Sequence, residues 1–118
     1  MQQHHHHVNY LELPARNLAQ TKAFFSQVFA WHFTDYGPDY AAFSNSGVLG
    51  GFFQSDKTSN TDNGAALVVL YSSDLEQTLA AVETAGGKIK QAIFSFPGGR
   101  RFHFIEPSGN ELAVWSDN

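Results

Sequence analysis

The chain repeats one pattern twice, the second copy starting 57 positions after the first. The identical residues are Leu13, Leu18, Gln20, Thr21 and Ala23, which recur as Leu70, Leu75, Gln77, Thr78 and Ala80. Each copy opens with a short apolar run, 8–13 in the first and 65–71 in the second, of the kind that forms a β-strand. The duplication predicts two halves of the same local structure.

A helix start follows each of these strands. Asn17 and Asp74 are suited to cap a helix, and Gln20 and Gln77 stand three residues later, the spacing of a capping box. Apolar residues then recur every three or four positions, which indicates one buried stripe on each helix. The glycines at 86–87 tolerate the positive φ at which a helix commonly ends.

Three extended runs follow each helix, separated by turn residues. They cover 32–36, 40–44 and 48–54 in the first half and 88–96, 101–106 and 111–116 in the second. The sequence therefore predicts an α+β fold with two βαβββ modules. We expect a His-rich tail at 1–7, a first module at 8–54, a linker at 55–64 and a second module at 65–118. A single helix cannot cover both faces of its sheet, so the modules are expected to combine into one domain.

The amino-acid composition argues against nucleic-acid binding and against insertion into a membrane. The 118-residue chain has 15% charged residues and a net charge of −4, and seven scattered Lys and Arg residues form no basic face for nucleic acid. No apolar run approaches the roughly 20 residues of a membrane span. There is no cysteine, and no secretory leader is recognisable at the N-terminus. We expect a cytoplasmic protein that binds neither nucleic acid nor membrane.

The pattern resembles the vicinal oxygen chelate superfamily, which contains glyoxalase I, bleomycin-resistance proteins and extradiol dioxygenases. The likeness spans 8–118 and is carried by the segments 12–14, 17–18, 24–31, 73–75, 85–88 and 106–110. Four residues depart from the usual pattern: Asn17, Phe25, Ala30 and Glu106. The resemblance implies an open, U-shaped cleft of mixed β-sheet with the helices outside, and a homodimer. It is specific for fold, but the fold hosts many reactions.

Metal-dependent members of this superfamily take ligands from the first and last strand of each module. Counting from Asn17, Asp74 and Asn110 places Tyr10, Leu67 and Ala113 at three of these positions, with Gly50 at the fourth. Such a site needs His and carboxylate ligands. The resemblance, read residue by residue, thus predicts that the metal centre is missing and that no cofactor is bound.

Alternation along the strands assigns residues to the cleft. The predicted ligand-binding residues are Tyr10, Glu12, Phe52, Gln54, Leu67, Arg101, His103 and Trp115, and the same alternation also turns Glu111 toward the cleft. A concave, mostly apolar and aromatic surface with a few polar groups is typical of a small-molecule pocket. The alternative, in which these aromatic residues simply fill the trough, stays open.

Four polar features have two interpretations each. Glu12 is a candidate acid or base if its apolar surroundings raise its pKa, or else a strand-edge glutamate. His103 faces either the cleft or the core, because the hairpin register is not fixed by sequence. Arg101 is either an anion-binding residue beside the 97–99 turn or part of a solvated turn. The histidines at 4–7 are native or the remnant of a purification tag, and bind metals opportunistically in either case.

The function predicted from these observations is metal-independent binding of a small, apolar or aromatic molecule in the cleft. The alternative is a glyoxalase-like lyase or isomerase that acts on a small carbonyl compound. It would use Glu12 as a metal-free acid or base, or non-standard metal ligands drawn from His7, Glu12 and His103. Whether the protein is an enzyme stays open at this level.

Overall fold

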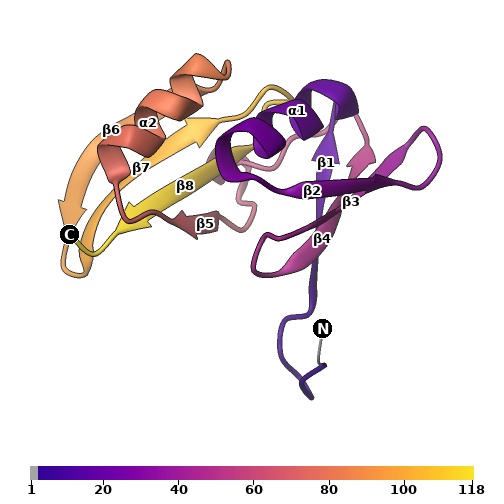
Figure 1. The fold of residues 1–118 in the computed structure, drawn as a ribbon, viewed down its shortest axis with the longest axis horizontal. Helices are drawn as coiled ribbons and strands as arrows, with labels where there is room; N and C mark the ends of the chain where they lie inside the picture. Colours follow the sequence, from indigo (N-terminus) through magenta and orange to yellow (C-terminus); the bar gives the residue numbers. More distant parts are fainter. Residues whose placement is uncertain (1–2) are drawn as a thin grey trace.

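The computed structural model describes residues 3–118 (Figure 1). The first module consists of β1 (Tyr10–Ala15), α1 (Leu18–Phe29), β2 (His32–Asp35), β3 (Tyr40–Ser44) and β4 (Leu49–Gln54). The second consists of β5 (Val68–Tyr71), α2 (Leu75–Thr84), β6 (Lys88–Phe96), β7 (Gly99–Ile105) and β8 (Glu111–Ser116). A short 3₁₀ helix, η1 (Thr61–Asn63), lies between them.

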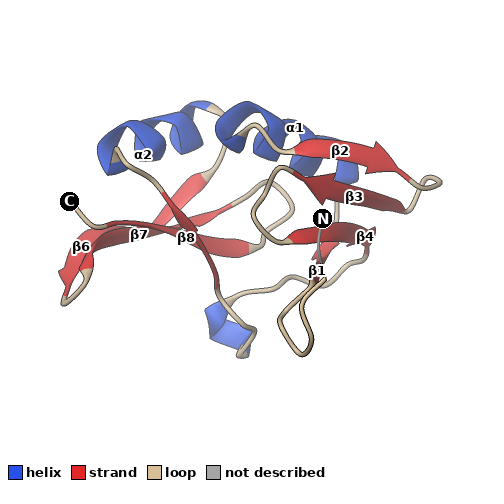
Figure 2. Cartoon of the chain, turned by 60° about the horizontal axis from the view of Figure 1, so that its bottom comes forward, coloured by secondary structure: helices blue, strands red, loops and turns tan. Residues whose placement is uncertain are grey.

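Each module builds one four-stranded mixed sheet. Sheet A has the order β1-β4-β3-β2 and sheet B the order β5-β8-β7-β6, so the two repeats have the same topology. The first strand of each module pairs in parallel with the last, β1 with β4 and β5 with β8. Both helices lie on one side of the sheets and leave the other side open (Figure 2). The predicted α+β fold of two βαβββ modules is confirmed.

The helix starts have the predicted N-caps but not the reciprocal bonds of a capping box. The backbone N–H of Asn17 donates to Ser108 Oγ, and that of Asp74 donates to Ser72 Oγ. The Asn17 side chain accepts a hydrogen bond from the Gln20 backbone N–H at 3.0 Å, and Asp74 accepts one from Gln77 at 3.2 Å. Each bond satisfies one of the N–H groups that a helix leaves unpaired in its first turn. The repeat in the sequence therefore corresponds to a repeat in capping geometry.

The two modules share one hydrophobic core on the helix side of both sheets. Phe24 and Phe29 of α1 lie with their rings 5.7 and 6.0 Å from that of Phe104 in sheet B. Phe52 of sheet A stacks on Phe25 of the same helix at 5.4 Å. Helix α1 thus contacts both sheets, and burial of its aromatic residues stabilises both modules together.

A buried polar turn also joins the modules. Glu106 accepts hydrogen bonds from Thr21 Oγ1 at 2.7 Å, from the Ser108 N–H at 2.9 Å and from Asn110 Nδ2 at 2.8 Å. Asn110 Nδ2 also donates to the Pro14 carbonyl at 2.7 Å. Burial raises the pKa of Glu106, although these hydrogen bonds oppose the rise. The turn at 106–110 therefore holds the end of β1 and the start of α1 against the second module.

Several elements differ from the predicted ranges by one to three residues at their ends, and the linker is not fully irregular. Strand β1 begins at Tyr10 rather than at 8, because its partner β4 begins at Leu49, which pairs with Tyr10. Strand β5 begins at Val68 rather than at 65, where its ladder with Leu112 starts. The expected linker contains η1, which the Asn60 side chain caps. Among residues 3–118, no helix is long and apolar enough to cross a membrane.

Candidate functional site

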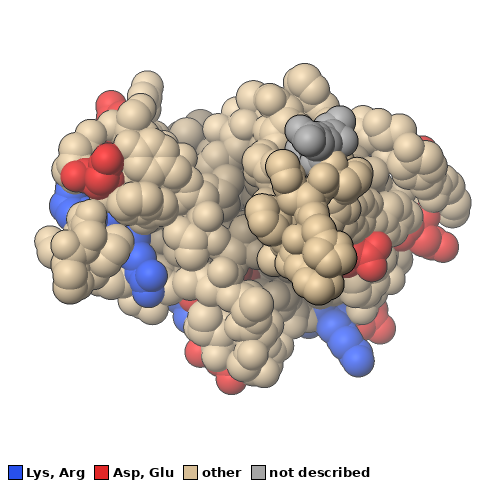
Figure 3. All heavy atoms as spheres, turned by 90° about the horizontal axis from the view of Figure 1, so that it is seen from below, with Lys and Arg blue, Asp and Glu red and all other residues tan. Residues whose placement is uncertain are grey.

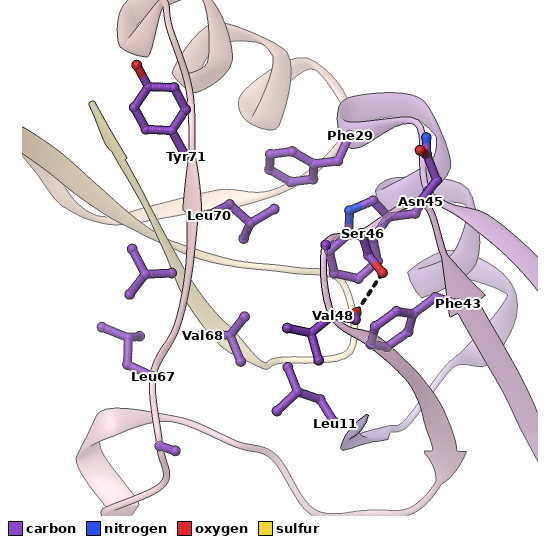
Figure 4. Close-up of a pocket in the computed structure, with 14 residues that line it drawn as sticks. Leu11, Phe29, Phe43, Asn45, Ser46, Val48, Leu67, Val68, Leu70 and Tyr71 are labelled. Carbon is purple, nitrogen blue, oxygen red and sulfur yellow. Dashed lines mark hydrogen bonds between the residues drawn. The ribbon is translucent and has the colours of Figure 1, made fainter. Parts of the chain in front are cut away.

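A cavity of about 610 Å³ lies between strand β5 and the first module (Figure 4). The loop at 45–48 forms one wall and β5 forms the other, and Val68 and Leu70 project from β5 toward Val48 and Phe29. Most of its lining is aliphatic or aromatic: Leu11, Phe29, Trp31, Phe43, Val48, Leu67, Val68, Val69, Leu70 and Tyr71. The volume lies within the range of about 300–1,000 Å³ that is usual for small-molecule sites.

This cavity forms because β5 is an edge strand. Its far side has no neighbouring strand within sheet B, so side chains of both faces reach the space beside the first module. Leu67 is the one predicted ligand-binding residue that lines it. Polar groups come from the loop at its rim, where Ser46 Oγ donates to the Val48 carbonyl at 2.7 Å.

The open face of sheet A holds a hydrogen-bonded chain of two tyrosines and a carboxylate. Tyr40 Oη donates to Glu12 Oε2 at 2.9 Å, and Tyr10 Oη lies 2.6 Å from Tyr40 Oη. Because the Tyr40 proton is used toward Glu12, the Tyr10 hydroxyl donates to Tyr40. Tyr10 and Glu12 face the open side, as the alternation predicted, while Leu13 is buried beneath the helices.

Gly51 leaves space for the hydrogen-bonded side chains of Tyr10, Tyr40 and Glu12. A Cβ on Gly51 would lie 2.2 Å from Tyr40 Oη, so any larger residue would displace the hydroxyl. Partial burial, followed by the hydrogen bonds to Tyr10 and Glu12, raises the pKa of Tyr40 well above its ordinary value. Tyr40 therefore stays protonated and acts as a donor to Glu12 at neutral pH.

The open face of sheet B is aromatic and positively charged. His103 pairs with Ala113 and Arg101 with Trp115 across the β7–β8 ladder, while Phe102 and Phe104 point into the core. This register settles the orientation of His103, which lies on the open side although only 3% of its surface is exposed. Arg101, His103 and Trp115 thus share one face of sheet B.

Sequence reasoning did not single out the role of Glu111. Its Oε2 lies 2.7 Å from His103 Nδ1, and its Oε1 accepts bonds from Thr61 N–H at 2.8 Å and Lys90 Nζ at 3.0 Å. Burial alone would raise the pKa of the Glu111 carboxyl, but the bonds from His103, Thr61 and Lys90 outweigh it and lower the pKa to about 2. The alternation signal placed Glu111 on the cleft side, but its partners come from η1, β6 and β7, which no local pattern connects.

Two predicted residues lie elsewhere. Phe52 is fully buried on the helix side against Phe25, so its assignment to the cleft was wrong. The register pairs Tyr10 with Leu49 and Glu12 with Gly51, which shifts the open face of β4 by one residue. Gln54, at the end of β4, donates to the Arg16 carbonyl at 2.9 Å and is exposed.

The predicted residues therefore gather in three places rather than in one cleft. Tyr10 and Glu12 lie on sheet A, Leu67 lies in the cavity, and Arg101, His103 and Trp115 lie on sheet B. Within residues 3–118, no hydrogen bond or ring contact joins the sheet A group to the sheet B group. Tyr71 connects the cavity to sheet B, because it lines the cavity and its ring contacts that of Trp115 at 5.2 Å.

The residues present do not fit the divalent metal that related folds hold. Gly50 is packed against Phe43 on the core side, so Gly51 replaces it as the open-face position of β4. The four corresponding positions then carry Tyr10, Gly51, Leu67 and Ala113, whose side chains offer no His or carboxylate donor. Over the described part of the chain, no three His, Asp or Glu side chains gather closely enough to hold an ion.

Charge is sparse on the side seen in Figure 3, where uncharged atoms cover most of the middle. Arg100 forms an ion pair with Glu76 of α2, so it is engaged at the surface rather than directed toward a ligand. The Arg101 guanidinium instead lies over the rings of Phe94 and Phe96, at 5.3 and 5.7 Å. The two adjacent arginines therefore have different surroundings.

Solved structures share this fold at low sequence identity. A glyoxalase/bleomycin resistance protein/dioxygenase family enzyme from Burkholderia phytofirmans PsJN superposes with a TM-score of 0.79 at 13% identity, covering 94% of this chain and 98% of that one. The fosfomycin resistance protein FosX from Listeria monocytogenes gives 0.76 at 13% identity, with 95% and 93% covered. The antibiotic binding protein TnmS3 from Streptomyces sp. CB03234 gives 0.68 at 15% identity, with 95% and 96% covered.

Among curated proteins, no sequence matches this one significantly. The family model described as "Glyoxalase/Bleomycin resistance protein/Dioxygenase superfamily" matches residues 6–114, which is nearly the whole chain. The match agrees with the two βαβββ modules and with the solved structures of similar fold. The chain belongs to the glyoxalase/bleomycin resistance protein/dioxygenase superfamily.

Proposed function

We propose that this protein binds a small apolar or aromatic molecule and needs no divalent metal to do so. The observation that carries the proposal is the cavity between β5 and the first module, with its aliphatic and aromatic lining and polar groups confined to the rim. Such a lining favours a ligand that gains free energy by leaving water, and the rim groups fix its orientation. The antibiotic binding and fosfomycin resistance proteins of similar fold support a small-molecule ligand.

The donor chemistry supports metal independence. The four positions at which related proteins place ligands hold a phenol, a glycine, a leucine and an alanine, none of which replaces His or a carboxylate. Glu12 and Glu111 are the carboxylates nearest in sequence to this set, each two residues from a member. Glu12 accepts a hydrogen bond from Tyr40, and Glu111 accepts bonds from Thr61 and Lys90. The proposal therefore assigns binding to side-chain packing and hydrogen bonds.

Binding is tested with N-phenyl-1-naphthylamine, an uncharged probe whose fluorescence rises in apolar surroundings. Val48 lines the cavity at its rim, so Val48→Phe is expected to fill part of it and weaken binding by roughly tenfold, equivalent to about 1.4 kcal/mol. Val8→Phe is the matched control, because Val8 is 76% exposed and does not line the cavity.

Two results would contradict the proposal. Equal affinity of the wild type and Val48→Phe would place the probe elsewhere on the protein. Loss of binding after treatment with a chelator, with recovery on adding a divalent metal, would refute metal independence. Trp31 also lines the cavity, so quenching that disappears in Trp31→Phe but persists in Trp115→Phe supports the location.

Acid–base catalysis at Glu12 is the second candidate, favoured by the chain of hydrogen bonds from Tyr10 through Tyr40 to Glu12. A carboxylate held by a phenol that stays protonated is arranged to accept a proton from a carbonyl substrate, as a lyase or isomerase requires. Turnover of a small α-oxo aldehyde that falls by orders of magnitude in Glu12→Gln supports this reaction. Unchanged turnover in that variant removes Glu12 as the base.

We also propose that the protein forms a homodimer. Strands β1 and β5 each form one of the two edges of their sheets, and edge strands with exposed apolar side chains favour pairing with another chain. Tyr10 of β1 and Tyr71 of β5 are 44% and 53% exposed. Since Tyr71 also lines the cavity, a partner on β5 would close one side of it. A monomer mass in light scattering across the working concentration range would refute the dimer.

A further inference from the structure

A bulge in the outermost strand of sheet B turns two phenylalanines to the open face. Gln91 pairs with His103, and the next regular pairs are Phe94 with Arg101 and Phe96 with Gly99, so the register shifts between Gln91 and Phe94. Regular alternation from Gln91 would have placed Phe94 on the core side. The bulge instead delivers its ring to the neighbourhood of Arg101 and His103, and bulges of this kind commonly re-aim side chains next to functional sites.

A row of aromatic rings leads from the cavity to His103. The Tyr71 ring contacts Trp115 at 5.2 Å, and Trp115 lies 6.3 Å from Phe96. Arg101 lies over Phe96 and Phe94, and Phe94 lies 5.9 Å from the His103 ring. An aromatic ligand that enters beside Tyr71 therefore meets ring surfaces along the open face until it reaches a guanidinium and an imidazole.

Two buried nitrogens at the end of this row have no hydrogen-bond partner among the described residues. They are Nε of Arg101 and Nε2 of His103, two residues apart on the same face of β7. Buried polar atoms in proteins are nearly always paired, with water or a ligand when protein groups are absent. Two unpaired nitrogens from one face of the same strand indicate a place where a ligand supplies the missing polar partner.

The surroundings define the charge that this place favours. Nδ1 of His103 lies 2.7 Å from Glu111 Oε2, and a carboxylate only accepts, so the proton of this bond belongs to Nδ1. In the tautomer with its proton on Nδ1, Nε2 is an acceptor. Glu111 and Asp62 of η1 are both bonded to Lys90 of β6, whereas Arg101 has no carboxylate within ion-pair distance in the described chain. Arg101 is thus the cation on this face that no carboxylate of the described residues pairs with, and Nε2 of His103 lies two residues from it on the same strand.

From this geometry we infer that sheet B binds an aromatic ligand carrying an acidic hydroxyl, held as its oxyanion between Arg101 and His103. The ligand hydroxyl donates its proton to Nε2 of His103, giving an imidazolium and a phenolate with no change in total charge. Glu111 stabilises the imidazolium as a positioning residue, and Arg101 Nε–H donates to the phenolate oxygen. The inference rests on the proposed function and adds the class of ligand.

The test uses 4-nitrophenol, whose phenolate absorbs visible light, and 4-nitroanisole, which has the same ring without the acidic proton. At a pH below the pKa of free 4-nitrophenol, wild-type protein is expected to raise the phenolate band of the bound ligand. A charge-assisted hydrogen bond predicts roughly a tenfold increase in the ratio of phenolate to phenol. Trp115 fluorescence reports the binding of both compounds.

Variants separate the roles. Arg101→Met keeps an apolar side chain over Phe94 and Phe96, so it is expected to abolish the phenolate band while leaving 4-nitroanisole affinity within about twofold of wild type. His103→Gln is expected to abolish the band as well. Glu111→Gln removes the carboxylate that stabilises the imidazolium and is expected to weaken the band without removing ring binding. Circular dichroism confirms that each variant is folded.

The outcomes distinguish the two proposals. Binding of both compounds with no phenolate band, or a band that persists in Arg101→Met, overturns the oxyanion site and leaves the proposed function standing. Absence of binding for both compounds and for the uncharged naphthylamine probe overturns the proposed function, and the oxyanion site with it.

Discussion

The buried carboxylate of Glu111 makes the stability of this protein depend on pH in a defined range. Its native pKa is about 2, against an ordinary value of 4.5, because His103, Thr61 and Lys90 donate hydrogen bonds to its charged form. A carboxyl whose pKa is depressed on folding adds stability above its unfolded pKa and loses it as pH falls toward the native pKa. The loss therefore begins near pH 5 and is complete below pH 2.

The size of the effect follows from the two pKa values. Each tenfold change in proton affinity is worth about 1.4 kcal/mol, so the full contribution of Glu111 is about 3 kcal/mol. At pH 3 the unfolded carboxyl is mostly protonated while the native one is not, and about 2 kcal/mol of the free energy of unfolding is lost. Burial raises the pKa of Glu106, so its folded form takes up a proton more readily than its unfolded form. Its contribution to the free energy of unfolding therefore rises as pH falls, opposite to that of Glu111.

The assay is urea denaturation at pH 7 and pH 3, compared between the wild type and Glu111→Gln. Glu111→Gln is less stable at pH 7 but cannot titrate, so its decrease in unfolding free energy between the two pH values is expected to be about 2 kcal/mol smaller than that of the wild type. Glu83→Gln, at an exposed position of α2, is expected to keep the wild-type decrease. Equal decreases in the wild type and Glu111→Gln would refute the reasoning.

Three further predictions concern the core, the contact between modules and sheet A. Phe52→Ala removes a fully buried ring and should lower the free energy of unfolding by about 3–5 kcal/mol in urea; a loss below about 1 kcal/mol would contradict its place in the core. Thr21→Val removes one of the buried donors to Glu106 and should cost about 1–3 kcal/mol by the same assay, more than the repeat-equivalent Thr78→Val, whose partner Ser72 is only partly buried. Glu12→Gln should lower the pKa of Tyr40 in an ultraviolet titration of tyrosine, because the phenolate then faces no negative charge; an unchanged titration curve would exclude the carboxylate as a cause.

Local signals in the sequence were sufficient for the fold. The repeat-related caps at Asn17 and Asp74 act over three residues, and each forms the bond that its spacing predicts. Within the turn at 106–110, Glu106 accepts a hydrogen bond from the Ser108 N–H, two residues further on. Interactions within one turn are set by neighbouring residues, which explains why they can be predicted from sequence.

Strand faces were predictable only where the pattern alternates. Tyr10 and Glu12 alternate with buried leucines, and their orientation was predicted correctly. The last strand of the first module reads Gly50-Gly51-Phe52-Phe53, which gives no alternation, so its register is decided by pairing with β1 and β3. The prediction that Phe52 faces the cleft was wrong for this reason.

The candidate site depends on contacts between distant segments. His103 meets Glu111 only once the β7–β8 hairpin sets its register, and Lys90 and Thr61 reach the same carboxylate from two other elements. The cavity exists because β5 is an edge strand beside the first module, which is a property of sheet order rather than of any residue. Neither feature has a local pattern by which it could be recognised.

The buried turn at 106–110 makes the two repeats non-interchangeable, because its contact residues differ between them. If the two halves of a chain were identical, each half would pair with a second copy of itself as well as with the other half. Here Glu106 and Asn110 of the second half form hydrogen bonds with Thr21 and Pro14 of the first. Each half thus carries only one side of this contact. If the chain is cut within 55–64, one N-terminal fragment should therefore assemble with one C-terminal fragment. A permuted chain with the second half first should keep the fold if a new linker spans the original termini.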